Sequence, residues 1–462
     1  MNYFLRRRMF LILLFLFTGF SFAFAKAGGH KFVCISDVHF NPMYNSSLVD
    51  TLIKSPYKKW DAIFATMDTT GFCNYGEDTN YKLFNSFLNE LSKVDSKPDF
   101  VIFTGDFLAH DFLKTFRSIT RDTTQYASNA FIYKTFGFIT SQITKHLPGV
   151  VVYFTLGNND SYTGDYTSIW DGEFFHTTAD LFFNNFIKKD KFKKSFYNTY
   201  PVSGCYSILL PDKKFRIISV NANFLSSNAP SNQSQYGQNV IDWLGSELKT
   251  ARANNEKVWV LNHILPGIDV YDTMAKVKPG EQIDSAYVFF TDNYNEQFIK
   301  LIKQYGSIIS ACFGGHIHMD DFRLYKSDPE VDKPAETFIH IIPAVSPVFE
   351  NNAAFQVFSY NSVDYSLTDF DTYYLDLSST DKQWKLEYNF VSTYKQKGIN
   401  AKSLNVILSL ILNDTVYRND YINYYNVSSL HGTIKDSWLG NWAGISGLTK
   451  PVFISLYNKY VK

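Results

Sequence analysis

The sequence predicts an α/β protein, because short apolar runs alternate with segments of helix length. The runs are rich in the β-branched and aromatic residues that strands prefer, and they read KFVCIS, DFVIFT, VVVYFT, KVWVL and IISACF. Segments between them, such as 81–94 and 241–253, are long enough for helices. Strands alternating with helices are typical of an α/β sheet. In such sheets, ligands bind beyond the carboxyl ends of the strands.

Length and charge limit the classes of function. The 462 residues allow one large α/β domain with an appendage. Lys plus Arg and Asp plus Glu both number 44, so the formal charge is zero. A balanced chain has no overall field to attract nucleic acid or an anionic membrane. We therefore expect no nucleic-acid partner, at most peripheral membrane contact, and a monomer.

The N-terminus predicts a signal peptide over residues 1–25. Three arginines at 6–8 precede an apolar stretch over 9–22, and Ala23 and Ala25 flank Phe24 in an A-x-A cleavage pattern. A membrane anchor is the alternative, but the apolar stretch is short for a bilayer span. We therefore expect an exported protein, either secreted or lysosomal.

Export is consistent with four predicted glycosylation sites. These are Asn45, Asn232, Asn413 and Asn426. Of the four cysteines, Cys34 and Cys312 lie in apolar runs and are interpreted as buried free thiols. A disulfide between Cys73 and Cys205 is left open, because four cysteines allow three pairings.

Five of the apolar runs stop at residues that can bind metal ions. One histidine or one Gly-Asp pair is more often a surface or turn residue than a ligand. Several at the ends of neighbouring strands indicate one site instead. The candidate ligands are Asp37, His39, Asp106, Asn158, His263, His316 and His318, and His110 follows Asp106 by four residues.

Seven ligands are too many for one ion, which needs three or four protein ligands and an open position. With one bridging carboxylate, they suit two ions. Two ions about 3.5–4 Å apart serve phosphoryl transfer by orienting the nucleophile and neutralising charge. Imidazole with carboxylate favours Zn²⁺, and manganese or iron stays open.

The motifs SDVHFNP, GDFLAHD, LGNND, NHILPG and GGHIHMDDF, in this order, resemble those of the calcineurin-like metallophosphoesterases. The GDFLAHD spacing and the segment 341–377 resemble the acid sphingomyelinase and acid sphingomyelinase-like phosphodiesterase group more narrowly. The likeness implies a sandwich of two mixed β-sheets flanked by helices, with a catalytic domain over 30–390. A small, mostly helical region is expected over 391–462.

The resemblance also implies a role for each site residue. It assigns one ion to Asp37, His39 and His318, and the other to Asn158, His263 and His316, with Asp106 bridging. A bridging water or hydroxide would attack phosphorus in line, and His110 would contact the phosphoryl group or protonate the leaving alkoxide. Asn159 stands where relatives have histidine. Its amide can donate a hydrogen bond to a phosphoryl oxygen but cannot deliver a proton. The sequon that begins at Asn159 is interpreted as coincidental.

The resemblance implies phosphodiesterase activity. The substrate it favours most is sphingomyelin, which would be converted to ceramide and phosphocholine. No cysteine-rich saposin-like segment precedes Lys31, so membrane sphingomyelin is not expected to be the sole substrate. A phosphodiesterase for nucleotides or CDP-choline-type molecules is an alternative, as is an inactive secreted binding protein on the same scaffold. A purple acid phosphatase is disfavoured, because Ala109 stands where that group has its tyrosine ligand. Residues 161–176 and 265–282 are expected to determine selectivity.

Overall fold

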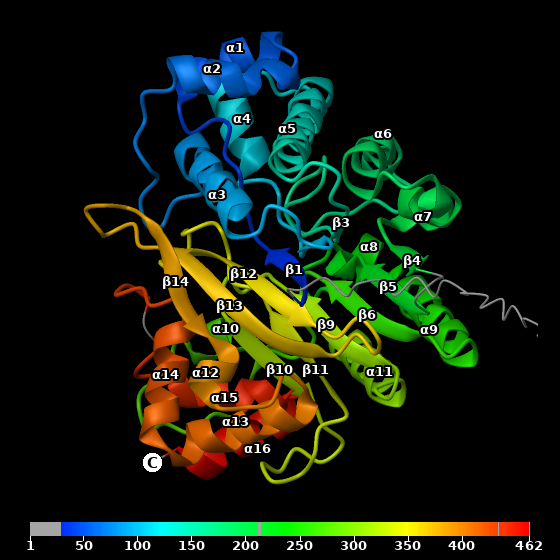
Figure 1. Ribbon diagram of the computed structural model, residues 1–462, viewed down its shortest axis with the longest axis vertical. Helices are drawn as coiled ribbons and strands as arrows, with labels where there is room; N and C mark the ends of the chain where they lie inside the picture. The colour runs from blue at the N-terminus through cyan, green and yellow to red at the C-terminus, as the bar shows by residue number, and fades with distance from the viewer. Residues whose placement is uncertain (1–28, 211–213, 433, 462) are drawn as a thin grey trace, which may run out of the picture.

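The computed structural model describes residues 29–210, 214–432 and 434–461, so the predicted signal peptide lies outside the described residues. Two six-stranded mixed sheets pack together, with helices around them (Figure 1). This confirms the predicted α/β sandwich. Strands β7 (Ile268–Asp269) and β8 (Tyr287–Val288) form a third, two-stranded antiparallel sheet.

The first sheet has the order β14-β13-β12-β1-β2-β3. Strands β1, β2 and β3 are parallel, and β12, β13 and β14 extend the sheet antiparallel beyond β1. The bounds are β1 His30–Ile35, β2 Val101–Phe103, β3 Val152–Phe154, β12 Ala353–Tyr360, β13 Leu367–Leu375 and β14 Trp384–Asn389.

The second sheet has the order β10-β11-β9-β6-β5-β4. Its four central strands, β11, β9, β6 and β5, are parallel, and the two edge strands are antiparallel. The bounds are β4 Tyr206–Leu210, β5 Phe215–Val220, β6 Lys257–Asn262, β9 Ile309–Gly314, β10 Asp321–Tyr325 and β11 Thr337–Ile341.

Aromatic side chains fill the space between the sheets. The ring of Phe32 on β1 lies 4.9 Å from Trp259 on β6 and 5.1 Å from Phe358 on β12, measured between ring centroids. Trp259 in turn lies 5.3 Å from Phe313 on β9. All four side chains are fully buried, so the burial of apolar surface stabilises the packing of the two sheets against each other.

Helices α1 to α5 lie together at one end of the molecule in Figure 1, and α6 and α7 pack against each other beside them. Helix α9 packs on β5 and β6 of the second sheet, and α10 contacts α15 of the C-terminal region. The bounds are α1 Val49–Lys54, α2 Trp60–Met67, α3 Tyr81–Val94, α4 Phe112–Thr120, α5 Gln125–His146, α6 Glu173–Phe182, α7 Asp190–Ser203, α8 Ser231–Ser234, α9 Gly237–Ala253, α10 Val270–Met274 and α11 Asp292–Gln304.

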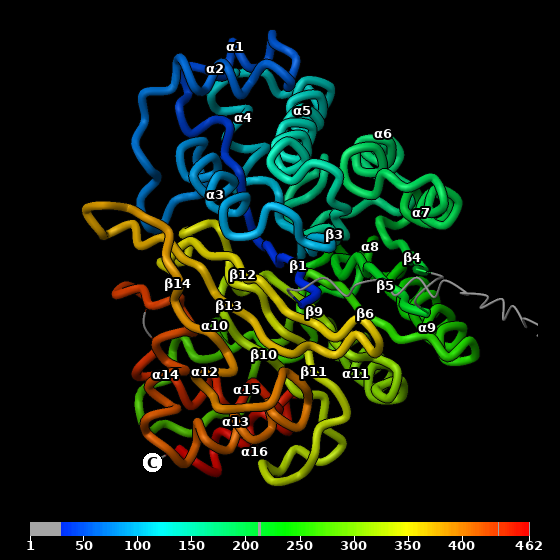
Figure 2. The backbone as a smooth tube through the Cα atoms, viewed as in Figure 1, coloured from blue at the N-terminus to red at the C-terminus, as the bar shows by residue number. Residues whose placement is uncertain are grey.

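The C-terminal region is helical, as expected, and lies at the end of the molecule opposite α1 and α2 (Figure 2). Its helices share the main core: Trp442 is fully buried and donates its indole N–H to the carbonyl of Leu408 at 2.8 Å. Tyr424 stacks on Tyr388 of β14 at 4.1 Å. The bounds are α12 Phe390–Tyr394, α13 Ala401–Asn413, α14 Thr415–Tyr425, α15 Trp438–Ser446 and α16 Lys450–Tyr460. Every helix within the described ranges is too short or too polar to cross a bilayer.

All four cysteines are free and buried, which confirms the interpretation of Cys34 and Cys312. A disulfide between Cys73 and Cys205 is wrong. Cys73 lies in a small separate apolar cluster with Leu83 and Leu375, whereas Cys205 lies in the main core. Burial raises the pKa of both thiols to about 11.

The predicted glycosylation sites differ in access. Asn232 and Asn413 are exposed and Asn45 is half-buried, so these three stay predictions. Asn426 is 1% exposed, and its Nδ2 donates hydrogen bonds to the carbonyls of Ser429 and His431. The expectation of a glycan at Asn426 is therefore contradicted, because the amide nitrogen is buried and already engaged.

Candidate dimetal active site

The predicted ligands meet at one edge of the sandwich because they follow parallel strands. Strands β1, β2 and β3 are neighbours in the first sheet, and β6 and β9 are neighbours in the second. Their carboxyl ends therefore converge. In strand order the ligands are Asp37 and His39 after β1, Asp106 after β2, Asn158 after β3, His263 after β6, and His316 and His318 after β9.

The backbone at these positions is strained. Five of the ligands are non-glycine residues with φ in the left-handed region, which costs free energy for most side chains. Such strain is maintained only where the surrounding structure requires it, and it concentrates at functional sites. The φ values are 47° at Asp37, 42° at His39, 56° at Asp106, 74° at His316 and 65° at His318.

Two glycines allow the strand ends to approach closely. A Cβ at Gly157 would lie 1.9 Å from Oδ1 of Asp106, and a Cβ at Gly315 would lie 2.6 Å from Oδ2 of Asp37. Neither contact is sterically possible, so the carboxylates can occupy these positions only beside glycine. The glycines of LGNND and GGHIH therefore make room for the ligands.

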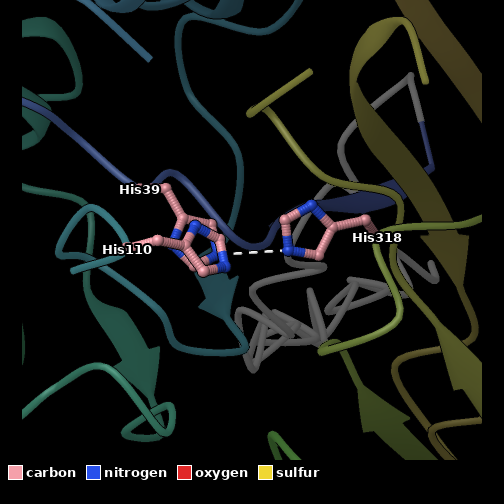
Figure 3. A group of neighbouring side chains, drawn as sticks. All are labelled: His39, His110 and His318. Atoms are coloured by element: carbon pink, nitrogen blue, oxygen red, sulfur yellow. Dashed lines mark hydrogen bonds between the residues drawn. The ribbon is translucent and has the colours of Figure 1, made fainter. Parts of the chain in front are cut away.

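One group of side chains surrounds His39. Its Nε2 lies 3.1 Å from Nε2 of His318, 3.4 Å from Oδ2 of Asp106 and 3.7 Å from Oδ1 of Asp37. Nε2 of His318 lies 3.3 Å from the same Asp37 oxygen. Figure 3 shows the rings of His39 and His318 pointing at each other from opposite sides of the site.

A second group surrounds His263. Its Nε2 lies 3.2 Å from Oδ2 of Asp106 and 3.1 Å from Oδ1 of Asn158. Asp106, His263 and His316 offer ligand atoms within 4.8 Å of one another. Oδ2 of Asp106 therefore faces both His39 and His263, which is the position that the bridging assignment requires.

The donor set fits cations. Nδ1 of His39 donates to the carbonyl of Leu108 at 2.9 Å, and Nδ1 of His263 donates to the carbonyl of Thr104 at 2.8 Å. In the neutral rings, the Nε2 lone pairs then face carboxylate oxygens and one another. Nδ1 of His318 is buried without a hydrogen-bond partner among the described residues. Acceptors gathered around a common point, with ring orientation set by backbone carbonyls, are typical of metal sites.

The electrostatics agree with the geometry. Burial lowers the pKa of His39, but the carboxylates of Asp106 and Asp37 outweigh it and raise that pKa to about 9. The same two carboxylates raise the pKa of His263 to about 9 against the effect of burial. Burial, together with the neighbouring His263, lowers the pKa of His316 to about 3. The two carboxylates thus favour positive charge beside His39 and His263, whereas burial keeps the ring of His316 neutral.

Comparison with known proteins agrees with this site. Residues 30–320 match the family model described as calcineurin-like phosphoesterase, and residues 334–438 match that of the acid sphingomyelin phosphodiesterase C-terminal region. The chain belongs to the calcineurin-like phosphoesterase family. That family is hydrolytic and depends on two metal ions, so the chain is a metal-dependent phosphoesterase.

The similarity to curated relatives extends over most of the chain. The chain is 26% identical to Sphingomyelinase phosphodiesterase D of Dictyostelium discoideum, over 92% of this chain and 95% of the relative. It is also 26% identical to human Acid sphingomyelinase-like phosphodiesterase 3b, over 89% and 86%. The bovine Cyclic GMP-AMP phosphodiesterase SMPDL3A is 26% identical over 81% and 78%. These relatives are all named phosphodiesterases.

In this member of the calcineurin-like phosphoesterase family, His110 stands beside the ligands. Its ring stacks on that of His39 at 4.1 Å between centroids, and its side chain is 33% exposed (Figure 3). The carboxylate of Asp78 contacts His110 at two places. One oxygen accepts from the His110 backbone N–H at 2.9 Å, and the other lies 2.8 Å from Nδ1 of the ring. Sequence reasoning missed Asp78, which lies in a loop before α3 with no motif to mark it.

Asn159 lies against Asp106. Its backbone N–H and its side-chain Nδ2 each donate to the Asp106 carboxylate at 2.9 Å. The side chain thus supports the shared carboxylate, a contact that the sequence did not predict. The suggested hydrogen bond to a phosphoryl oxygen stays a prediction.

Asp160 is a second residue that sequence reasoning missed. Its buried carboxylate accepts four backbone N–H groups, from Asp106, Phe107, Leu108 and Gly157. It therefore holds the loop after β2 against the loop after β3. A signal was present in the sequence, because Asp160 directly follows the pair of candidate residues Asn158 and Asn159.

Proposed function

We propose that this phosphoesterase is a sphingomyelin phosphodiesterase that releases ceramide and phosphocholine, with two zinc ions held by the seven strand-end ligands. The arrangement around Asp106 carries the proposal. Its Oδ2 lies between His39 and His263, and His110 stacks on His39 from the solvent side. When bound, two ions orient the nucleophile, lower the pKa of water and neutralise developing charge.

The residues of this chain then have distinct tasks. Nδ1 of His110 donates to Asp78, so Nε2 is the ring nitrogen that can reach substrate. From the open side of His39, that nitrogen contacts a phosphoryl oxygen or delivers a proton to the leaving alkoxide. Asn159 has no usable pKa and can only donate hydrogen bonds. Proton delivery therefore falls on His110.

The side chains beside His110 and His318 are suited to binding a cationic headgroup. Phe349 is 44% exposed, and its ring meets those of His318 at 4.6 Å and His110 at 5.8 Å, both edge-on. Glu350 follows it, half-exposed, with one carboxylate oxygen 3.5 Å from Nδ1 of His431. The ring of Tyr75 lies 4.5 Å from that of His431. Aromatic faces with a carboxylate attract quaternary ammonium groups such as choline.

A substrate panel tests the proposal. Purified protein is assayed with sphingomyelin in detergent micelles, CDP-choline, a cyclic dinucleotide, bis(nitrophenyl) phosphate and nitrophenyl phosphate, each with and without chelator. We expect sphingomyelin turnover that chelator abolishes and restored Zn²⁺ recovers. Two zinc ions per chain should be found by elemental analysis, and Asp106→Ala should lose both ions and activity.

The panel also distinguishes the alternatives. Preference for the cyclic dinucleotide, the class of substrate in the bovine relative's name, would contradict the lipid substrate. Preference for CDP-choline would contradict it as well. Better turnover of the monoester than of any diester would contradict a phosphodiesterase. No turnover at all, with two ions bound, would indicate the inactive binding protein.

We propose in addition that the protein is exported, to the extracellular space or the lysosome. The basic and apolar N-terminal residues support this. N-terminal sequencing of the protein from a eukaryotic host should find a chain that begins near Lys26. Retention of Arg6, Arg7 and Arg8 in mature protein would contradict cleavage.

A further inference from the structure

The loop of residues 161–172 touches a metal ligand through Asp165. Oδ1 of Asp165 accepts a hydrogen bond from Nδ2 of Asn158 at 2.7 Å. The backbone N–H of the next residue, Tyr166, donates to the carbonyl of Asn158 at 2.9 Å. Asn158 is thus held by both its side chain and its backbone, and its Oδ1 is directed at His263.

The direction of the Asn158 amide matters because its two ends differ. The oxygen can bind a cation, whereas the NH₂ group can only donate. A carboxylate at 2.7 Å accepts hydrogen bonds and offers none while it is ionised. Asp165 therefore favours the single orientation in which Oδ1 of Asn158 faces the site and Nδ2 faces away.

Tyr166 makes the corresponding contact to His316. Its hydroxyl lies 3.3 Å from Nε2 of His316, and its ring meets the imidazole edge-on at 6.0 Å. Because this ring nitrogen faces the phenol, Nδ1 is the nitrogen left for an ion. Asn158 and His316 both belong to the ligand set assigned to the second ion.

The loop itself is fixed to the body of the protein. The buried side chain of Gln233 accepts from the backbone N–H of Ser168 at 2.7 Å and donates to the carbonyl of Tyr166 at 2.9 Å. Asn223 connects the loop to β3, since its Nδ2 contacts the carbonyl of Gly157 at 2.8 Å and the hydroxyl of Ser168 at 3.2 Å. Asp165 and Tyr166 are therefore presented to the ligands by a rigid support.

We propose that Asp165 and Tyr166 are positioning residues for the second ion: Asp165 selects the oxygen of Asn158, and Tyr166 selects the ring nitrogen of His316. This inference rests on the proposed two-ion function. It gives residues 161–172 a role in metal binding in addition to the predicted role in selectivity. Partners that orient metal ligands typically change metal affinity by about 10- to 100-fold.

Cobalt binding tests the proposal without an activity assay. The full chain is stripped of metal and titrated with Co²⁺ alone, and the visible spectrum reports each ion. We expect the wild type to bind two ions. Asp165→Ala should keep the first ion and bind the second about 10- to 100-fold more weakly. Tyr166→Phe, which removes only the hydroxyl, should weaken the second ion in the same direction by less.

A matched control separates this effect from general loss of a carboxylate. Asp180 is exposed on α6, and its side chain accepts only from the Tyr197 hydroxyl among the described hydrogen bonds. Asp180→Ala should bind both ions like the wild type. If Asp165→Ala also binds both ions normally, or loses both equally, the inference is overturned while the two-ion function stands. A wild type that binds fewer than two ions would instead overturn the proposed function.

Exchange of the two side chains gives an independent test. Asn158→Asp alone would set two carboxylates against each other and should weaken the second ion. Adding Asp165→Asn restores a donor–acceptor pair in the opposite sense, so the double variant should regain at least about tenfold in second-ion affinity. A double variant that binds the second ion no more tightly than Asn158→Asp would contradict the proposal. If Asp165→Ala does not fold, this comparison of second-ion affinities is the deciding test.

Discussion

Oδ2 of Asp160 accepts the backbone N–H of Asp106 at 2.9 Å, so the buried carboxylate after β3 positions the shared carboxylate after β2. The same side chain accepts three further backbone N–H groups from the two loops. Asp106 has φ of 56°, a conformation that needs support from its surroundings. The four hydrogen bonds that Asp160 accepts supply that support.

Asp160→Asn should destabilise the protein and disturb the site. The amide keeps one acceptor oxygen and sets an NH₂ group against two buried N–H donors. Loss of each acceptor costs about 1–3 kcal/mol, so the free energy of unfolding should fall by about 2–6 kcal/mol. Urea unfolding of metal-free protein measures this. Asp180→Asn, an exposed change of the same kind, should stay within about 0.5 kcal/mol of wild type, and equal stability of both variants would refute the role of Asp160.

Asp78→Asn should impair proton delivery by His110. Asp78 holds both the backbone and Nδ1 of His110, and so keeps Nε2 directed at substrate. General acid catalysis is typically worth about 10²–10⁴-fold, and His110→Ala should lose that much kcat on an unactivated diester with both ions retained. For Asp78→Asn we expect kcat on the same substrate to fall at least about tenfold, because His110 is still present but is no longer held in place.

The leaving group separates catalysis from positioning in both variants. A nitrophenolate departs without a proton, so the losses should shrink sharply with bis(nitrophenyl) phosphate. Equal losses on both substrates would mean that His110 positions the phosphoryl group instead.

Asn159→His should add a second proton donor. The asparagine amide donates to Asp106, and a histidine at this place could also donate to Asp106 while gaining a titratable ring. We expect two ions to remain bound and turnover of substrates with poor leaving groups to rise. Metal analysis and kcat against a series of leaving groups measure this. Loss of one ion, or a glycan on Asn159 of the active wild type, would contradict the site as described.

His340 should make stability fall at acid pH. It is buried between the sheets with Nε2 2.8 Å from Oε1 of Gln356, and burial lowers its pKa from 6.5 to about 4. Between these values the unfolded chain takes up a proton that the folded chain does not. Stability is therefore unaffected above pH 6.5 and falls by up to about 3 kcal/mol as pH drops to 4.

The test compares urea unfolding at pH 7.5 and 4.5 for wild type and His340→Gln. Asp320 lies 3.9 Å away and acts in the opposite direction, because burial raises its pKa to about 7 and the folded chain takes up that proton first. Since Asp320 is present in both proteins, their difference reports His340. The variant should lose less stability on acidification. Identical pH dependence in the two proteins would show that His340 does not contribute.

The fold class and the ligand set could be predicted because both are local in the sequence. Strands show as short β-branched runs, and the metal-binding residues follow those runs directly, as at Asp37 and His316. The rule that parallel strands present their carboxyl ends at one edge then brings distant ends together. The candidate ligands follow from that rule, and they stay predictions, whereas the role of His110 was implied by the resemblance of GDFLAHD to the family motif.

The tertiary structure alone decided which residues support that set. Asp78 reaches His110 across 32 positions, and Asp160 reaches Asp106 across 54. The separation of Cys73 from Cys205 and the burial of Asn426 depend likewise on how distant segments pack. A carboxylate that accepts backbone N–H groups looks the same in sequence as one on the surface. Its role is determined by which donors the packed sheets and loops bring within hydrogen-bond distance, and packing is a property of the whole chain.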